Sequence, residues 1–321
     1  MYRQGFIGLF FAVIVSAPTA AAGLRLLTVP ADTSGPEIIV SVWYPSPDKP
    51  APVSFGSIPM MAARDGKFDG PGDGKGLPLI VLSHGAGGSF VVLHHTAERL
   101  ADAGFIVAAP NHPGDWVRDR SQYYELSVYV QRRLQVKRVI DHMTGASPLA
   151  TTIDPDRIGI YGFSRGGYTA LVAIGANPDF SLVLPRCEGR TDKICNQIRA
   201  HEYPGEPLTH DRRIKAAVVA DLLSIFFTAE SLAGITIPVQ LWGSEKGGDG
   251  IDPKTVEALN TQLKAPHTFT KVENAQHFSF LTICPPDLTE PELCMDAPGF
   301  DRAQFHEQFN DALIKFFRAN L

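Results

Sequence analysis

The stretch Gly162-Phe163-Ser164-Arg165-Gly166 is the feature that most constrains how this chain can fold. It follows a short apolar run ending at Tyr161 and precedes a helix-forming segment over 168–176. A G-x-S-x-G pentad between a strand and a helix is the pattern of a nucleophile elbow, a sharp turn that holds a serine hydroxyl above a sheet. Small residues two positions before and after the serine avoid a clash in so tight a turn. The pentad therefore predicts a strand, turn and helix with Ser164 as the candidate nucleophile.

Apolar runs alternate with helix-forming segments on both sides of this pentad. Strands are expected over 24–29, 37–44, 77–82, 105–109, 215–220, 237–242 and 267–272, and helices over 90–103, 123–143, 253–263 and 302–319. Continuous apolar runs such as Leu77 to Leu82 are typical of strands buried on both faces. This alternation predicts an α/β fold with a mostly parallel central sheet and helices on both faces. The segment 45–76 is rich in Pro, Gly and Asp, and its part from Asp65 to Gly76 is expected to be a surface loop.

The first 22 residues have the pattern of a secretory signal peptide. Arg3 is the only charged residue before an apolar run from Phe6 to Val15, and Ala20-Ala21-Ala22 offers an A-x-A cleavage site. The run is short for a membrane span, so we expect cleavage after Ala22 and no stable membrane insertion afterwards. The sequence thus predicts a signal peptide over 1–22 and a single domain over 23–321, with an insertion at about 178–211. Such a protein would be exported, to the periplasm or to the medium.

The four cysteines fall into two local pairs, Cys187 with Cys195 and Cys284 with Cys294, in loop-type sequence. An even number of cysteines in an exported chain suggests disulfides, and of the three possible pairings we expect the two local ones. None of the four has metal-ligand spacing with a histidine, so no metal site is expected.

Composition narrows the range of partners. A net charge of −5 over 321 residues gives no reason to expect nucleic acid or an anionic membrane surface. The glycine-rich loop His84-Gly85-Ala86-Gly87-Gly88 matches neither phosphate-binding pattern, so no nucleotide is expected. The sequence gives no indication of oligomeric state.

Three candidate catalytic residues follow predicted strands. Ligands of open parallel sheets bind at the carboxyl ends of the strands, and here a serine, an acid and a histidine occur there in the order that this fold class uses. A serine hydroxyl needs an adjacent base. His277 lies in the loop after the last predicted strand and is the candidate base. The other histidines after Ser164 lie at a strand start, on a helix or in the insertion: His201, His210, His267 and His306.

The acid has two candidates. Asp221 follows the apolar run 216–220, where a bare carboxylate would be costly unless it had a partner. Asp249 follows the next strand, among glycines, and could be a solvated loop residue. Either could orient the imidazole of His277 and stabilise its positive form. The sequence favours Asp221 and leaves Asp249 as the alternative.

An oxyanion hole needs two backbone N–H groups aimed at the developing negative oxygen. One is expected from Arg165, the residue after the nucleophile. The other is expected from the glycine-rich loop, at Ala86, where glycines let the backbone approach a substrate closely.

These motifs together resemble the α/β-hydrolase superfamily, within it the dienelactone-hydrolase-like group, and especially the plasma-type platelet-activating-factor acetylhydrolases. The resemblance covers most of 37–318 and is carried by 83–85, by 104–109 with the following His112, by 162–167, and by the His277 loop. It implies a serine esterase without a metal or organic cofactor, and it favours Asp221 as the acid. Dienelactone hydrolases themselves have a cysteine nucleophile where this chain has Ser164. The insertion 178–211 and the loop 284–294 also depart from the acetylhydrolase pattern.

The expected function is that of an exported serine carboxylic-ester hydrolase, which acts through a Ser-His-Asp triad and an acyl-enzyme intermediate. Its expected partner is a small-molecule ester or lipid, either a short-chain acyl ester or an acetylhydrolase-like phospholipid. The same triad also serves amide or peptide hydrolases and acyltransferases, so these remain alternatives. Outside enzymes, the alternative is a non-catalytic binding protein with a hydrolase fold.

Overall fold

The computed structural model describes residues 21–321 except 56–57, 71–75, 206, 209 and 285–290. The predicted signal peptide lies outside the described residues up to position 20. Strand β1 (Ala21–Val29) begins two residues before the predicted cleavage site, and Ala21 and Ala22 already pair with β2. Over the described ranges, no helix has the length and apolar character that a membrane crossing requires.

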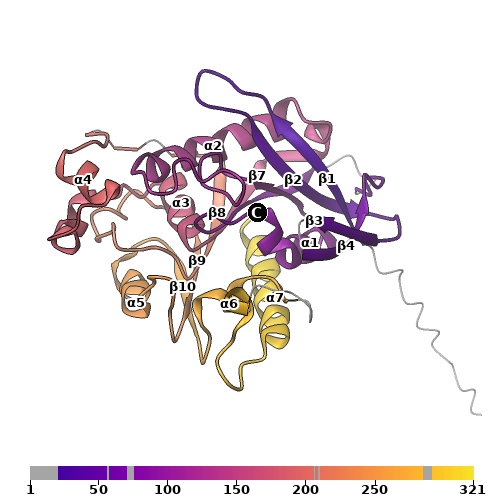
Figure 1. The fold of residues 1–321 in the computed structure, drawn as a ribbon. Coiled ribbons are helices and arrows are strands. Elements are labelled where there is room, and N and C mark those ends of the chain that lie inside the picture. The colour runs from indigo at the N-terminus through magenta and orange to yellow at the C-terminus, as the bar shows by residue number, and fades with distance from the viewer. Residues whose placement is uncertain (1–20, 56–57, 71–75, 206, 209, 285–290) are drawn as a thin grey trace, which may run out of the picture.

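The described strands form one ten-stranded sheet in the order β10-β9-β8-β7-β5-β6-β2-β1-β4-β3 (Figure 1). The six strands from β10 to β6 are parallel to one another, whereas β2 is antiparallel to β6 and β1 is antiparallel to β2. The mostly parallel sheet predicted from the sequence is therefore confirmed. The remaining strands are β2 (Ile38–Ser46), β3 (Ala51–Phe55), β4 (Ile58–Arg64), β5 (Leu77–Ser83), β6 (Ile106–Pro110), β7 (Ile153–Phe163), β8 (Ile214–Ala220), β9 (Val239–Ser244) and β10 (His267–Val272).

Helices cover both faces of the sheet, and side chains alternate between two apolar layers. In β5, Leu79 and Val81 pack in the layer with α2, α3 and α5, whereas Ile80 and Leu82 pack in the layer with α1 and α7. The helices are α1 (His94–Asp102), α2 (Ser127–Gly145), α3 (Arg165–Ala173), α4 (Lys193–Arg199), α5 (Pro253–Gln262), α6 (Pro291–Cys294) and α7 (Arg302–Asn320). Short 3₁₀ turns are η1 (Phe90–Leu93), η2 (Ala150–Thr152), η3 (Phe180–Cys187) and η4 (His277–Phe280).

Within 45–76, where the sequence analysis predicted no strand, the structure contains the hairpin of β3 and β4. Pro52 and Pro59 make the segment look like loop. Pro52 lies on β3, the edge strand, and Pro59 lies in the part of β4 that does not pair with β1, and proline is tolerated at such edges. Met60 and Ala62 of β4 are buried in the core. The hairpin extends the sheet beyond β1 and brings Phe55 and Ile58 to the cavity described below.

Both local disulfides expected from the sequence are present, Cys187–Cys195 and Cys284–Cys294. The first closes a short loop between η3 and α4, inside the predicted insertion. The second joins the segment after η4 to the end of α6.

The parallel strands deliver the candidate residues to one edge of the sheet. Ser164 follows β7, Asp221 follows β8, and His277 begins η4 after β10. The glycine-rich loop that starts at His84 follows β5, which pairs with β7. Residues far apart in the sequence therefore meet where these strands end.

Candidate active site

Ser164 occupies a strained turn between β7 and α3. Its φ of 56° and ψ of −122° lie outside the regions that a side-chain-bearing residue ordinarily adopts. A Cβ at Gly162 would collide with the carbonyl of Gly166, and a Cβ at Gly166 would collide with the carbonyl of Ser83. Both glycines of the pentad are thus required by close backbone approach. The Ser164 N–H donates to the carbonyl of Ala220, which ties the turn to β8.

Ser164, His277 and Asp221 form a chain of hydrogen bonds. The Oγ of Ser164 lies 3.1 Å from Nε2 of His277, and Nδ1 of His277 lies 2.7 Å from Oδ2 of Asp221. Because a carboxylate only accepts, Nδ1 carries the proton and Nε2 is free to accept the serine hydroxyl. The ring of His277 stacks on Phe163, with centroids 4.6 Å apart, and its backbone N–H donates to the carbonyl of Gly247. These contacts fix both the orientation and the tautomer of the imidazole.

Asp221 is completely buried and has hydrogen-bond donors at both oxygens. The Ser244 N–H donates to Oδ1 over 2.7 Å, the Ser244 hydroxyl lies 2.9 Å from each oxygen, and His277 donates to Oδ2. These donors compensate the loss of water that would otherwise make a buried carboxylate costly. Asp249 is exposed and lies at the cavity wall. The structure therefore brings Asp221 to His277, and among the described residues Asp249 makes no hydrogen bond to that histidine.

Of the two predicted oxyanion donors, Ala86 belongs to the cavity lining and Arg165 directly follows Ser164 in the chain. Ala86 lines the same cavity as Ser164 and His277, and a Cβ at Gly85 would lie 3.3 Å from Cβ of Ser164. Arg165 is the first residue of α3, so its N–H lies among the groups that a helix leaves without an intrahelical acceptor. Within the described ranges, the Ala86 N–H donates to no protein acceptor, whereas its neighbour Gly87 donates to Asp115 over 3.0 Å.

A buried polar network, missed by the sequence analysis, lies behind this loop. Asp115 is completely buried and forms ion pairs with Arg132 and Arg165. Arg132 also donates to the carbonyl of His84, at the start of the loop. Asp115 follows β6, so strand-end placement could have flagged it. Its partners come from α2 and from the elbow, and no sequence pattern joins those segments.

Two histidines of this network are neutral. Burial, followed by the charge of Arg132, lowers the pKa of His84 to about 3. The same two causes hold the pKa of His112 well below its ordinary value. His84 accepts a hydrogen bond from the His112 N–H, and the His112 ring lies between Ser83 and Gln135. Because both rings are neutral and hydrogen-bonded, they add no further positive charge beside the two buried guanidinium groups of this network.

A cavity of about 520 Å³ opens on Ser164. Polar groups at its wall include Arg118, Arg120 and Asp249. Much of the remaining lining is apolar and comes from the β3–β4 hairpin, η1, the segment after β6 and the segment from η4 to α6: Phe55, Ile58, Phe90, Val91, Val92, Val117, Phe278, Leu281 and Leu293. Leu293 lies next to Cys294, so the second disulfide loop borders the cavity, whereas residues 187–195 contribute nothing to its lining.

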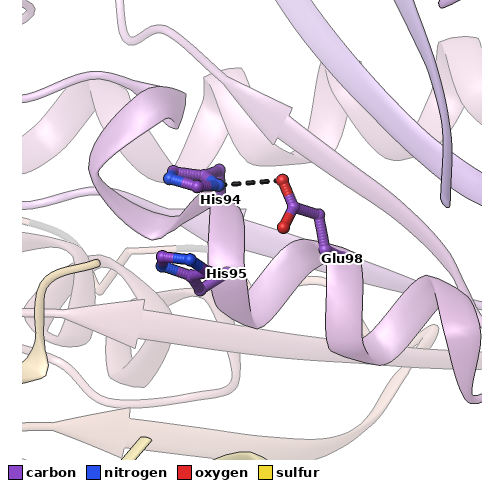
Figure 2. Close-up of side chains that lie close together, drawn as sticks. All are labelled: His94, His95 and Glu98. Carbon is purple, nitrogen blue, oxygen red and sulfur yellow. Dashed lines mark hydrogen bonds and ion pairs between the residues drawn. The ribbon is translucent and has the colours of Figure 1, made fainter. Parts of the chain in front are cut away.

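A separate cluster on α1 contains His94, His95 and Glu98, whose ligand-type atoms lie within 4.8 Å of one another (Figure 2). A metal would have to displace existing contacts there. Nδ1 of His94 is bonded to Glu98 over 2.8 Å, and Nδ1 of His95 accepts the Ile283 N–H over 3.1 Å. Burial and the neighbouring His94 lower the pKa of His95 to about 3. These contacts account for the cluster as a tie between α1 and the segment before Cys284.

Comparisons with known proteins agree with this architecture. The sequence model of the prolyl oligopeptidase family matches residues 92–186, and that of platelet-activating factor acetylhydrolase, isoform II, matches residues 51–130. Each match covers less than half of the chain, and neither reaches Asp221 or His277. No curated protein matches the chain significantly. A solved structure of a ferulic acid esterase from Streptomyces cinnamoneus is similar at a TM-score of 0.65 and 21% identity, over 96% of this chain and 92% of that one.

Proposed function

We propose that this chain, which has the α/β-hydrolase fold, is a serine carboxylic-ester hydrolase. The observation that carries the proposal is the hydrogen-bonded chain from Ser164 through His277 to Asp221, at the wall of a largely apolar cavity. A neutral imidazole that accepts from a serine and donates to a buried carboxylate is the arrangement that activates a serine nucleophile.

The reaction would proceed in two halves. Ser164 Oγ attacks the ester carbonyl while Nε2 of His277 takes its proton, and the resulting oxyanion accepts hydrogen bonds from the N–H groups of Ala86 and Arg165. Collapse of this intermediate expels the alcohol, which receives the proton from His277, and leaves an acyl group on Ser164. Water, activated by the same imidazole, then releases the carboxylic acid. Asp221 stabilises the positive imidazolium in both halves.

The cavity supports an ester with a modest apolar acyl or aryl group. A volume of about 520 Å³ lies within the range of small-molecule sites, and its apolar lining favours hydrocarbon over a charged acyl group. Short-chain acyl esters, and phospholipids with short acyl chains, are the first candidates. A hydroxycinnamoyl ester is a further one, because the similar solved structure is described as a ferulic acid esterase.

We also propose that the protein is exported to the periplasm or the medium after cleavage of residues 1–22, and that residues 23–321 form a single domain. Two disulfides support this, since such bonds persist in oxidising compartments.

Peptide hydrolysis is the second candidate function. The match to the prolyl oligopeptidase family covers 92–186, which includes Ser164. The same triad can cleave amides, so substrate preference has to separate the two activities.

The test is turnover of a p-nitrophenyl ester series from acetyl to palmitoyl, alongside methyl ferulate and peptide p-nitroanilides, by the mature protein and by Ser164→Ala. We expect the shorter esters to be preferred. We expect Ser164→Ala to lower kcat by about 10³- to 10⁶-fold without changing the melting temperature. Ser89→Ala is the matched control, because it removes a cavity-wall hydroxyl that does not contact His277.

Each result bears on the assignment. Full activity of Ser164→Ala would contradict it. Faster cleavage of the anilides than of every ester would favour the peptide hydrolase. No turnover of any substrate, with intact fold and no labelling of Ser164 by a phosphonate, would leave the non-catalytic binding protein as the better account.

A further inference from the structure

Asp115 has hydrogen-bond donors from three segments of the chain. Its Oδ1 accepts from the Gly87 N–H over 3.0 Å and from the guanidinium of Arg165 over 2.8 Å. Its Oδ2 accepts from Arg132 over 3.2 Å. The side chain of Asp115 is completely buried, and those of Arg132 and Arg165 are nearly so. Charge-assisted bonds in so dry a place are strong and directional, so this carboxylate is a fixed point of the structure.

Two of those donors adjoin the predicted oxyanion hole. Gly87 follows Ala86, and Arg165 carries both a predicted oxyanion N–H on its backbone and the guanidinium that binds Asp115. One carboxylate oxygen therefore joins the glycine-rich loop after β5 to the start of α3. These two segments are far apart in the sequence. Even so, the N–H groups of Ala86 and Arg165 have to lie close enough together to donate to the same oxygen atom of the substrate.

The rest of the network holds the same loop from other directions. Arg132 donates to the carbonyl of His84, at the beginning of the loop, and to the hydroxyl of Ser83 over 3.3 Å. The Val117 N–H donates to the carbonyl of Gly88, at its end. Arg165 also lies over the rings of Tyr123 and Tyr129, with its guanidinium carbon 4.8 Å and 5.1 Å from their centroids. The loop is thus held at both ends while Ala86 faces the cavity.

We propose that Asp115 is a positioning residue that sets the separation of the Ala86 and Arg165 N–H groups and thereby holds the oxyanion hole ready before substrate binds. The proposal rests on the proposed esterase function. Asp115 does not touch substrate and does not line the cavity. It acts through Gly87 on one side and through the Arg165 side chain on the other.

Asp115→Asn is the main test, measured on the best ester of the p-nitrophenyl series. The amide keeps the size of the side chain but offers one acceptor oxygen in place of two and removes the charge. We expect kcat to fall about 10²-fold, as for a catalytic group displaced by about 1 Å, while KM stays within about threefold. The rate at which a phosphonate labels Ser164 should fall in parallel, because the phosphoryl oxygen needs the same two N–H groups.

Asp211→Asn is the matched control. Asp211 also binds a guanidinium, with Nε of Arg213 at 2.9 Å, but it does not line the cavity and lies outside the Asp115 network. We expect this variant to lose stability while keeping kcat, KM and the labelling rate. A loss of kcat in Asp115→Asn that is fully accounted for by a smaller fraction of folded protein would overturn the proposal.

Arg165→Gln keeps the test decisive should Asp115→Asn fail to fold. This variant retains the backbone N–H and removes the guanidinium that binds Asp115 and lies over Tyr123 and Tyr129, so kcat should again fall with little change in KM. Where both single variants fold, the double variant should lose less activity than the product of the single losses, because both changes cut one connection. Wild-type kcat in Arg165→Gln, or fully multiplicative losses, would contradict the coupling.

The two proposals fail in different ways. A wild-type protein that neither turns over esters nor reacts with the phosphonate would defeat the esterase function itself. An active wild type with an equally active Asp115→Asn would defeat only the positioning role.

Discussion

Two completely buried carboxylates support the site without lining the cavity, Asp221 through His277 and Asp115 through Gly87 and Arg165, and their hydrogen-bond partners differ. The Asp221 carboxylate accepts hydrogen bonds from Ser244 and from the ring of His277. The Asp115 carboxylate accepts from two guanidinium groups and a backbone N–H. The difference lies in whether the partner can change its charge.

This difference suits Asp221 to supporting proton transfer and Asp115 to holding a fixed geometry. An imidazole beside a carboxylate can take up a proton and be stabilised when it does, so the Asp221 side can follow the changes of charge during turnover. Guanidinium groups remain protonated in proteins, so the Asp115 side keeps one arrangement throughout. A fixed arrangement is what an oxyanion hole requires, because its advantage lies in dipoles that need not reorient during the reaction.

Asp221→Asn should cause the largest loss of kcat among the variants that test this comparison. An amide would hold His277 in the wrong tautomer and would not stabilise the imidazolium, so we expect kcat to fall about 10⁴-fold. This loss should exceed the loss in Asp115→Asn by about two powers of ten, if one carboxylate serves the proton transfer and the other the geometry. Steady-state kinetics of the two variants on the same ester measure the ratio. Equal losses would break the distinction.

Asp249→Asn is the matched control for that variant. Asp249 is the alternative acid from the sequence, and it lies at the cavity wall without a bond to His277. We expect kcat to change by less than about threefold. A loss as large as that of Asp221→Asn would assign the orienting role to Asp249.

The sequence predicted the parts of the site that lie next to a recognisable local pattern. Ser164 stands in a pentad whose glycines are required by backbone contact, and Asp221 and His277 each follow a strand. Parallel strands end at one edge, so strand order alone predicted that the three would meet. The mostly parallel sheet followed from the same alternation of buried strands and helices, and the structure confirms it.

The parts that the sequence did not predict depend on contacts between distant segments. Asp115 lies in a loop without a catalytic motif, and Arg132 lies on a helix whose charged residues look like a solvated face. Only folding brings both to the loop at His84. The β3–β4 hairpin was missed because its prolines indicate loop, although a sheet edge tolerates them.

The two disulfides can be compared in the same way, and their removal should have a smaller effect than the carboxylate substitutions. Cys284–Cys294 fixes the residue next to Leu293, which lines the cavity, and Arg302 donates to the Leu293 carbonyl over 2.9 Å. Replacing both cysteines by serine should cost about 2–3 kcal/mol of unfolding free energy. It should also shift the preference between short and long acyl chains by up to about tenfold, because the wall would move. Urea unfolding and the p-nitrophenyl ester series measure the two effects.

The other disulfide separates these effects. Cys187–Cys195 spans a loop of similar length, with a sequence separation of eight against ten, but its loop does not line the cavity. The corresponding double serine variant should lose similar stability with unchanged chain-length preference. An equal shift in preference for both variants would show that stability, and not the cavity wall, sets the specificity.

Acid pH should lower the free energy of unfolding, because the buried histidines of the Asp115 network are neutral in the folded protein. Burial and Arg132 lower the pKa of folded His84 to about 3, whereas an unfolded histidine titrates near 6.5. The unfolded state then binds more protons below about pH 6.5, so the free energy of unfolding falls as the pH is lowered towards 3. For His84 alone the slope approaches about 1.4 kcal/mol per pH unit at most.

His84→Gln should be less stable at pH 7 but should show a shallower slope between pH 6 and pH 4, measured by urea unfolding. The exposed His210 supplies the control, His210→Gln, which should keep the wild-type slope. If His84→Gln also keeps that slope, the acid sensitivity arises elsewhere, and the Asp115 side is no more dependent on neutral histidines than the rest of the fold.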